Sequence, residues 1–298
     1  MPSTSNHRAG FVNLIGNPNV GKSTLMNRLV GESLSIITSK AQTTRHRIKG
    51  IVNGEDYQIV YSDLPGILTP AYKMQEMMMR FVNESLKDAD VILYLIECGE
   101  TNYNQQIIEK LNLLEIPIIL VINKIDKSTP EQIETSRQHW QTLLPKADPI
   151  EISARDDRNI PALIDKIKAH LPLSPAYFPK DELTDRPTRF FVSEIIREKL
   201  LLLYKKEIPY SVEVVVDSFK EDDDMVRIGT TLYVERDTQK AIIIGSKGSA
   251  IKRLGTDSRT AIEEFLGKHV FLDISVKVLK DWRNSDLLMK RFGYYEGD

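Results

Sequence analysis

The chain has very little cysteine, with one residue, Cys98, among its 298 amino acids. A single cysteine excludes an internal disulfide. Without a second cysteine or a histidine cluster nearby, it also gives no signature of a metal site. Proteins with so few thiols commonly work in a reducing compartment. We therefore expect a cytoplasmic protein.

Long hydrophobic runs are also missing. The longest apolar stretches, such as "PIILVI" before Asn123, have the length of one strand and are far too short to span a membrane. Residues 1–10 lack both the apolar core of a signal peptide and the arginine-rich length of a transit peptide. These absences predict a soluble protein.

Neither sign of charge dominates, because 40 Lys and Arg stand against 42 Asp and Glu. This balance excludes only a wholly basic protein, since a local basic surface can be hidden in the whole-chain sum. A surface for nucleic acid must therefore be sought region by region. The length and the hydrophobic content of 41% are sufficient for two domains, each with its own core.

Residues 10–171 alternate short apolar runs with polar loops and amphipathic segments. This rhythm predicts an α/β domain with a mostly parallel sheet that is buried on both faces. Asn53-Gly54 lies between two strand-like runs and is a strong hairpin signal, so one edge strand should be antiparallel. The expected strands contain "FVNLIG", "RIKGIVN", "QIVYSD", "VILYLIE", "IPIILVIN" and "DPIEIS".

A change of composition predicts a domain boundary. Residues 172–187 contain four prolines, which lack the amide hydrogen that regular structure needs, so we expect a semi-stiff linker. Residues 188–283 follow the order α-β-β-α-α-β, which predicts a small α+β domain with an antiparallel core. Residues 1–9 and 284–298 are expected to be tails.

The segment "GNPNVGKS" matches the phosphate-loop pattern GxxxxGK[ST] and lies between a predicted strand and a predicted helix. In that setting backbone amides surround the α- and β-phosphates, and the helix N-terminus favours negative charge. Lys22 should reach the β- and γ-phosphates, and the Ser23 hydroxyl should ligate Mg²⁺. The expected nucleotide contacts here are Gly16, Asn17, Pro18, Asn19, Val20, Gly21, Lys22, Ser23 and Thr24.

Three later segments predict that the base is guanine. In "DLPG" the Asp63 carboxylate can hold a Mg²⁺-bound water, and the Gly66 amide can meet the γ-phosphate. In "NKID" the Asp126 carboxylate can accept both the ring N–H and the amino group of guanine. Lys124 can lie over the base while Asn123 braces the loops, and an amide of Ser153-Ala154 can donate to the guanine O6. All these segments follow predicted strands, at the edge where ligands bind. The expected contacts are Asp63, Leu64, Pro65, Gly66, Ile67, Asn123, Lys124, Asp126, Ser153 and Ala154.

Two threonines in "QTTR" can act as the detector of a switch, because a threonine here ligates Mg²⁺ only when the γ-phosphate is present. Thr44 is favoured and Thr43 is the alternative, so Lys22, Thr44 and Gly66 are the predicted catalytic residues. Ile67 stands where Ras-like enzymes place a water-orienting glutamine, which predicts slow hydrolysis.

Asn19 has two interpretations. Related GTPases with an asparagine at this position use its carbonyl to hold K⁺ where an arginine finger would otherwise place positive charge. The alternative is an asparagine that only stiffens the loop.

A second glycine-rich segment, "GSKG", joins a short predicted helix to a longer one. It lacks both the preceding buried strand and the Lys-Ser/Thr pair of a phosphate loop. A helix–GxxG–helix arrangement is typical of KH domains, in which the loop clamps about four nucleotides of single-stranded RNA. The alternative is a plain glycine turn between two helices. The expected RNA contacts are Gly245, Ser246, Lys247, Gly248, Lys252 and Arg253.

With these motifs the whole chain resembles the Era family of bacterial GTPases. The resemblance rests on "GNPNVGKS", "QTTRH", "DLPG", "NKID" and "SAR", followed by one type II KH domain with "IIIGSKGSAIKRLG". It implies a GTPase that binds GTP and GDP and associates with the 3′ end of small-subunit ribosomal RNA during assembly of the small ribosomal subunit. It also implies some peripheral contact with the inner face of the cell membrane.

Two other functions stay open. One is a signalling GTPase whose second domain binds protein, and the other is a phosphate-loop kinase or ATPase, which "NKID" opposes. We expect a monomer, because no heptad repeat predicts a coiled-coil dimer. The fold class that we expect is an α/β P-loop GTPase domain, with one antiparallel edge strand, followed by a small α+β type II KH domain.

Overall fold

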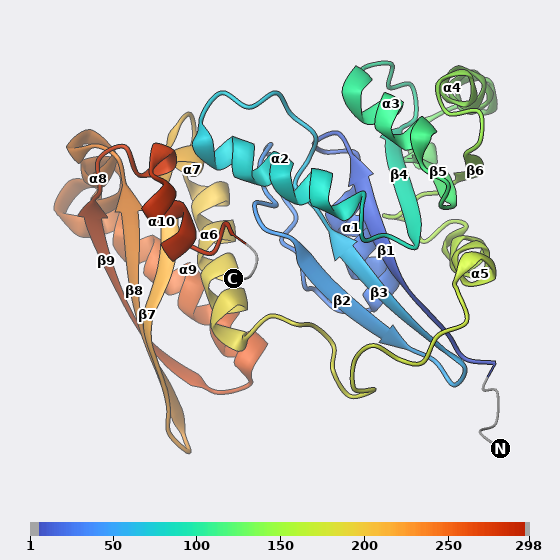
Figure 1. Cartoon of the computed structure of the whole chain (residues 1–298). Helices are drawn as coiled ribbons and strands as arrows, with labels where there is room; N and C mark the ends of the chain where they lie inside the picture. The colour runs from blue at the N-terminus through green and yellow to red at the C-terminus, as the bar shows by residue number, and fades with distance from the viewer. Residues whose placement is uncertain (1–5, 296–298) are drawn as a thin grey trace. The chain divides into compact units, whose positions relative to one another are not determined.

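The computed structural model describes residues 6–295, which form two compact units (Figure 1). The first unit contains residues 6–70 and 78–185, and the second contains residues 71–77 and 186–295. Residues 1–5 of the predicted N-terminal tail and 296–298 of the predicted C-terminal tail lie outside the described residues. The domain boundaries drawn from the sequence stay predictions.

The first unit is built on a six-stranded sheet with the order β2-β3-β1-β4-β5-β6. β2 pairs antiparallel with β3, and every other neighbouring pair is parallel. The expected α/β fold with one antiparallel edge strand is confirmed. Its strands are β1 (Arg8–Gly16), β2 (Ile48–Asn53), β3 (Tyr57–Asp63), β4 (Val91–Glu97), β5 (Ile118–Asn123) and β6 (Asp148–Glu151).

The carboxyl ends of four strands, which run parallel, lie at one edge of the sheet. β1 ends at Gly16, β3 at Asp63, β4 at Glu97 and β5 at Asn123. The residues of β5 are all buried, which fixes this edge on a close-packed framework. The helices between the strands are α1 (Lys22–Val30), α2 (Lys73–Ser85), α3 (Gln105–Leu113), α4 (Pro130–Leu143) and α5 (Ile160–His170).

The predicted linker is bound to this sheet through Gln58, which lies near the start of β3 and is fully buried. Its Oε1 accepts hydrogen bonds from the backbone amides of Tyr177 (2.7 Å) and Phe178 (3.0 Å). Its Nε2 donates to the Phe178 carbonyl (2.8 Å). Further along, the Ile51 amide of β2 donates to the Leu183 carbonyl (2.8 Å). The proline-rich segment therefore has fixed attachments to the first unit.

The second unit contains a three-stranded sheet with the order β7-β8-β9. β7 and β8 pair antiparallel, but β8 and β9 pair parallel, so the expected antiparallel core is wrong for one of its two pairs. The reason is the long helix α9, which returns the chain to the end of the sheet where β8 began, so that β9 starts beside the start of β8. Its elements are α6 (Thr188–Leu203), α7 (Ile208–Ser211), β7 (Glu213–Glu221), β8 (Met225–Val234), α8 (Asp237–Ile244), α9 (Ser249–Leu266), β9 (His269–Val278) and α10 (Asp286–Arg291).

The residues expected to form a C-terminal tail are folded as far as the structure describes them. α10 lies within this segment and buries Met289 completely. Tyr294 is 1% exposed, and its hydroxyl donates to Glu213 of β7 (2.9 Å). Trp282 is also buried, with its indole N–H on the Ser211 carbonyl (3.2 Å), so it does not offer a free face to a base. Among residues 6–295 no helix has the length and apolarity needed to cross a bilayer.

Replacing Gln58 with leucine should detach the linker from the sheet. The amides of Tyr177 and Phe178 would lose their acceptor, and each lost partner costs about 1–3 kcal/mol where the group stays buried. We expect hydrogen exchange of the peptide covering 172–185 to accelerate and the first unit to lose about 2 kcal/mol of stability. The matched Gln105→Leu variant changes an exposed glutamine and should leave both unchanged; slow exchange in Gln58→Leu would contradict this view of the linker.

Candidate functional site

A cavity of about 380 Å³ opens between the phosphate loop and the segment 36–44. It lies at the edge where the parallel strands end, as expected for a ligand site in this kind of sheet. Eleven of the residues proposed from the sequence line it, including the alternative threonine: Pro18, Asn19, Gly21, Lys22, Ser23, Thr24, Thr43, Thr44, Leu64, Gly66 and Lys124. The structure therefore brings the phosphate loop, "QTTR" and "DLPG" together around one space.

Lys22 is 6% exposed and its ammonium donates to the carbonyls of Gly16 (3.0 Å) and Asn17 (2.8 Å). Burial lowers the pKa of Lys22 to about 8, although the nearby carboxylates of Asp63 and Glu100 favour its charge. The preceding Gly21 adopts φ 104°, and a Cβ there would lie 2.3 Å from the side-chain Nδ2 of Asn123. The loop therefore holds the ammonium group of Lys22 close to where phosphates are expected, although this group has lost most of its contact with water.

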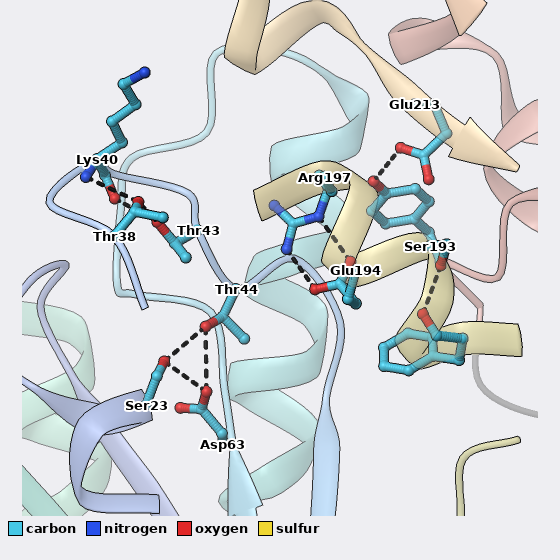
Figure 2. A network of polar contacts seen from close by, with 12 residues as sticks. Ser23, Thr38, Lys40, Thr43, Thr44, Asp63, Ser193, Glu194, Arg197 and Glu213 are labelled. Carbon is cyan, nitrogen blue, oxygen red and sulfur yellow. Dashed lines mark hydrogen bonds and ion pairs between the residues drawn. The ribbon is translucent and has the colours of Figure 1, made fainter. Parts of the chain in front are cut away.

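Three oxygen-bearing side chains from three segments converge in the cavity, those of Ser23, Thr44 and Asp63 (Figure 2). The Ser23 hydroxyl donates to Asp63 Oδ2 (2.7 Å) and lies 3.0 Å from the Thr44 hydroxyl. Thr44 also donates to Asp63 Oδ2 (3.2 Å). The first turn of α1, the loop before β2 and the end of β3 are therefore joined through one carboxylate.

The structure distinguishes the two candidate threonines. Thr43 turns away from Asp63, with its hydroxyl donating to the Lys40 carbonyl (2.7 Å) and lying 2.7 Å from the Thr38 hydroxyl. Figure 2 shows the two groups as separate networks. Thr44 lies beside Ser23 and Asp63, so its position suits the role for which the sequence favoured it; that it ligates Mg²⁺ stays a prediction.

The same three side chains have the chemistry of a magnesium site. Hard oxygen donors suit Mg²⁺, and Asp63 Oδ1 is buried with no hydrogen bond of normal geometry among residues 6–295, although the Ser35 hydroxyl is close enough to lower the pKa of this carboxyl. Burial raises the pKa of Asp63, while the hydrogen bond from Ser23 and the charge of Lys22 oppose this rise. A cation at this point would satisfy the unpaired oxygen and stabilise the carboxylate.

Asn123 braces the base side of the site as expected. It is 2% exposed, its Nδ2 donates to the Val20 carbonyl (2.8 Å), and its Oδ1 accepts from the Ala154 amide (3.0 Å). The Lys124 ammonium donates to the Asn19 carbonyl and to Glu97 Oε2, both at 2.6 Å. These bonds tie the phosphate loop to the two segments that are expected to surround guanine.

The backbone amides of Ser153 and Ala154 and the side chain at position 67 have less freedom to contact a ligand than the sequence suggests. The Ser153 amide donates to the Arg158 carbonyl (3.2 Å), and the Ala154 amide is used by Asn123, so neither amide points freely at a base in this conformation. Their expected contact with the guanine O6 stays a prediction. Ile67 is 5% exposed and its amide donates to the Gly16 carbonyl (3.1 Å), which leaves no polar side chain there to orient a water.

The "GSKG" loop of the second unit connects α8 directly to α9, as the sequence predicts. Gly245 and Gly248 have φ of 72° and 78°, in the left-handed region that favours glycine. A Cβ on Gly245 would lie 2.9 Å from the Ala250 backbone nitrogen. The Lys247, Lys252 and Arg253 side chains are exposed at and just after the loop, where they can meet phosphates.

Several residues at these two sites were not found from the sequence. In the second unit a groove of about 350 Å³ has an apolar floor beside Lys252 and is lined by Ile251, Gly255, Thr256, Arg259, Leu272 and Ile274. In the first unit, Glu100 accepts from the Asn17 side chain (2.7 Å) and Glu97 pairs with Lys124. Glu97 ends a buried strand, and this position in the sequence could have identified it as a site residue. The groove could not have been found in this way, because it is formed by the packing of α9 on β9.

Both halves of the chain match known families in sequence. Residues 11–124 match the family described as 50S ribosome-binding GTPase, and residues 207–283 match the KH domain. GTPase Era of Staphylococcus epidermidis is 43% identical over 293 residues, covering 97% of this chain and 98% of that protein. GTPase Era of Staphylococcus haemolyticus is 42% identical with the same coverage.

Two solved Era structures share the fold over nearly the whole chain. A variant of Era from Aquifex aeolicus bound to GDP·AlF4⁻ superposes with a TM-score of 0.92 at 36% identity, covering 96% of this chain and 99% of that one. Era in complex with MgGDPNP and nucleotides 1506–1542 of 16S ribosomal RNA gives a TM-score of 0.92 at 37% identity, covering 97% and 99%.

The fold and the two sites define a GTPase with a phosphate-loop G domain followed by a KH domain. Sequence identity above 40% to two Era proteins over nearly the full length assigns the chain to one family within this class. The chain belongs to the Era family of GTPases.

Replacing Lys22 with methionine should abolish nucleotide binding and yet stabilise the nucleotide-free protein at pH 7. The variant removes a buried cation whose charge is disfavoured by burial, and the two carbonyls that lose their donor offset part of that gain. We expect a net rise of about 1–2 kcal/mol in the free energy of unfolding, measured by denaturation without nucleotide. Lys22→Arg keeps the charge and should show no such rise, whereas a less stable methionine variant would count against the argument.

Proposed function

We propose that this GTPase binds the 3′ region of small-subunit ribosomal RNA through its KH domain and acts in assembly of the small ribosomal subunit. The bound guanine nucleotide controls this interaction. GTP orders the loops around Thr44 and Gly66, and hydrolysis to GDP allows the RNA to be released.

The observation that supports the RNA partner most directly is the match to Era in complex with 16S ribosomal RNA over 97% of this chain. The GxxG loop supports it independently, because its two left-handed glycines allow a backbone to approach closely. The adjacent groove combines a basic rim at Lys252 with an apolar floor suited to stacked bases.

On the nucleotide side, Ser23, Thr44 and Asp63 would hold Mg²⁺, which supplies positive charge to the β- and γ-phosphates. Lys22 leaves its two carbonyl acceptors and pairs with the same phosphates. The Gly66 amide donates to the γ-phosphate and thereby joins "DLPG" to the triphosphate form. Because Ile67 cannot orient water, the site depends on charge and positioning, and its intrinsic hydrolysis is slow.

K⁺ is the remaining cofactor in the proposal, with Asn19 as its ligand. The Asn19 side chain donates to the Ser39 carbonyl (3.3 Å), at the opening of the cavity, and its φ of 65° suits an asparagine that shapes a loop. Both properties of Asn19 agree with a loop-shaping role as well. The rate of GTP turnover in different salts distinguishes the two roles.

If Asn19 holds K⁺, GTP turnover in KCl should exceed turnover in NaCl of equal ionic strength by about tenfold or more, the scale on which one charge-stabilising group affects a rate. Asn19→Ala should lose this difference between the salts. Equal turnover of the unaltered protein in both salts would remove K⁺ from the mechanism and leave Asn19 as a loop-shaping residue.

The place of action follows from the RNA partner, which we take to be in the cytoplasm. The proposal includes peripheral contact with the inner face of the cell membrane, which rests on the sequence resemblance. It also includes a monomeric state, which rests on the lack of a heptad repeat in the sequence.

RNA binding through the KH loop predicts a specific loss in the Gly245→Asp, Gly248→Asp double variant. Aspartate brings negative charge to the expected phosphate path and is strained at both backbone conformations. We expect the affinity of the full chain for an RNA from the 3′ end of 16S ribosomal RNA to fall at least tenfold, roughly 1.4 kcal/mol, while GDP binding is unchanged.

Gly267→Asp is the matched control for this double variant. Gly267 also has a left-handed φ, of 65°, but it lies at the opposite end of α9 with nothing within 4 Å of its expected Cβ. RNA affinity that falls equally in the control would assign the loss to folding. RNA affinity that is unchanged in the double variant would favour a protein-binding second domain instead.

A further inference from the structure

The carboxylate expected to read guanine already faces two donors of its own chain. The Asp126 side chain is 4% exposed, and its Oδ1 accepts a hydrogen bond from the Ser153 hydroxyl (2.6 Å). Its Oδ2 lies 2.9 Å from the Nη2 of Arg155, which forms an ion pair. This approach lacks hydrogen-bond geometry, so Oδ2 has charge compensation but no hydrogen bond from residues 6–295.

Arginine and guanine present similar groups to such a carboxylate. The edge of guanine that carries N1–H and the 2-amino group is a planar guanidine built into a ring. The arginine side chain carries the same planar arrangement of N–H donors, with a positive charge added. Arg155 and the 2-amino group of guanine would therefore compete for the same oxygen of Asp126.

Arg155 has a second carboxylate to hold it when it leaves Asp126. Its Nε and Nη2 donate to the two oxygens of Asp156 at 2.8 and 3.2 Å. This hydrogen bonding lowers the pKa of Asp156 and keeps it charged. Because the Arg155 side chain is 64% exposed, it can turn toward solvent while it stays bound to Asp156.

We propose that Arg155 is a specificity-determining residue that occupies the guanine-reading oxygen of Asp126 in the nucleotide-free site and is displaced by the 2-amino group of guanine. The proposal rests on the nucleotide half of the proposed function and is independent of the RNA half. The competition weakens the hold on GDP and thereby favours its spontaneous release. It has no such effect on a base that lacks the 2-amino group, because Arg155 can then remain in place.

The experiment compares GDP with IDP, whose hypoxanthine base keeps N1–H but lacks the 2-amino group. Arg155→Met retains an apolar stem of similar length and removes the competing donors. We expect its dissociation constant for GDP to fall about two- to fivefold, the range for a partly exposed ion pair, and its dissociation constant for IDP to stay within about twofold. The rate of GDP release should slow by a similar factor.

Arg158→Met is the matched control, because it removes the same charge from the same exposed loop. It should alter neither nucleotide selectively. Equal tightening of GDP and IDP in Arg155→Met, or the same selectivity change in Arg158→Met, would overturn the proposal in favour of a general charge effect. Weaker binding of both nucleotides would overturn it in favour of a side chain that covers the base. Failure of the unaltered protein to bind GDP would instead refute the nucleotide half of the proposed function.

Discussion

The site depends on one buried carboxylate, Asp63 at the end of β3. A carboxylate without water needs donors, and here Ser23 and Thr44 provide them from the phosphate loop and from the segment before β2. Because "DLPG" continues directly from Asp63, the three segments that we propose to respond to the nucleotide meet at this residue. Any change in what surrounds Asp63 is therefore transmitted to two loops at once.

The phosphate pocket holds Lys22 and Asp63 close together, although burial disfavours the charged form of each side chain. Burial lowers the pKa of Lys22 and raises that of Asp63, so the charged form of each group is less favoured here than in water. Bound phosphates and a divalent cation would supply counter-charges to both groups, and the free energy recovered would add to the affinity for the nucleotide. The rigid part is the sheet, whose central strands are buried, while the responsive part is the set of loops at its edge.

The sequence was most informative where the geometry follows from a strand end or a turn. Asn53-Gly54 correctly predicted the antiparallel hairpin, and the positions of Asp63 and Asn123 after buried strands correctly predicted a shared edge. The sequence of β9 could not show that this strand runs parallel to β8, because a half-buried strand has the same alternating pattern in either direction. Gln58 and Tyr294 were missed because an isolated polar or aromatic residue does not reveal a partner more than 80 positions away. Arg155 was quoted within a motif, but its pairing with Asp126 depends on side-chain geometry that spacing does not give.

The central claim is that the nucleotide at Asp63 controls how strongly the KH domain holds RNA. The most direct measurement is the affinity of the full chain for RNA from the 3′ end of 16S ribosomal RNA, with GDPNP or with GDP bound. The account predicts tighter binding with GDPNP by about fivefold or more, the usual lower bound for coupling between two sites, and equal binding in the Thr44→Ala variant. Equal affinities in the unaltered protein would contradict the claim, since a ligand without differential affinity cannot operate a switch.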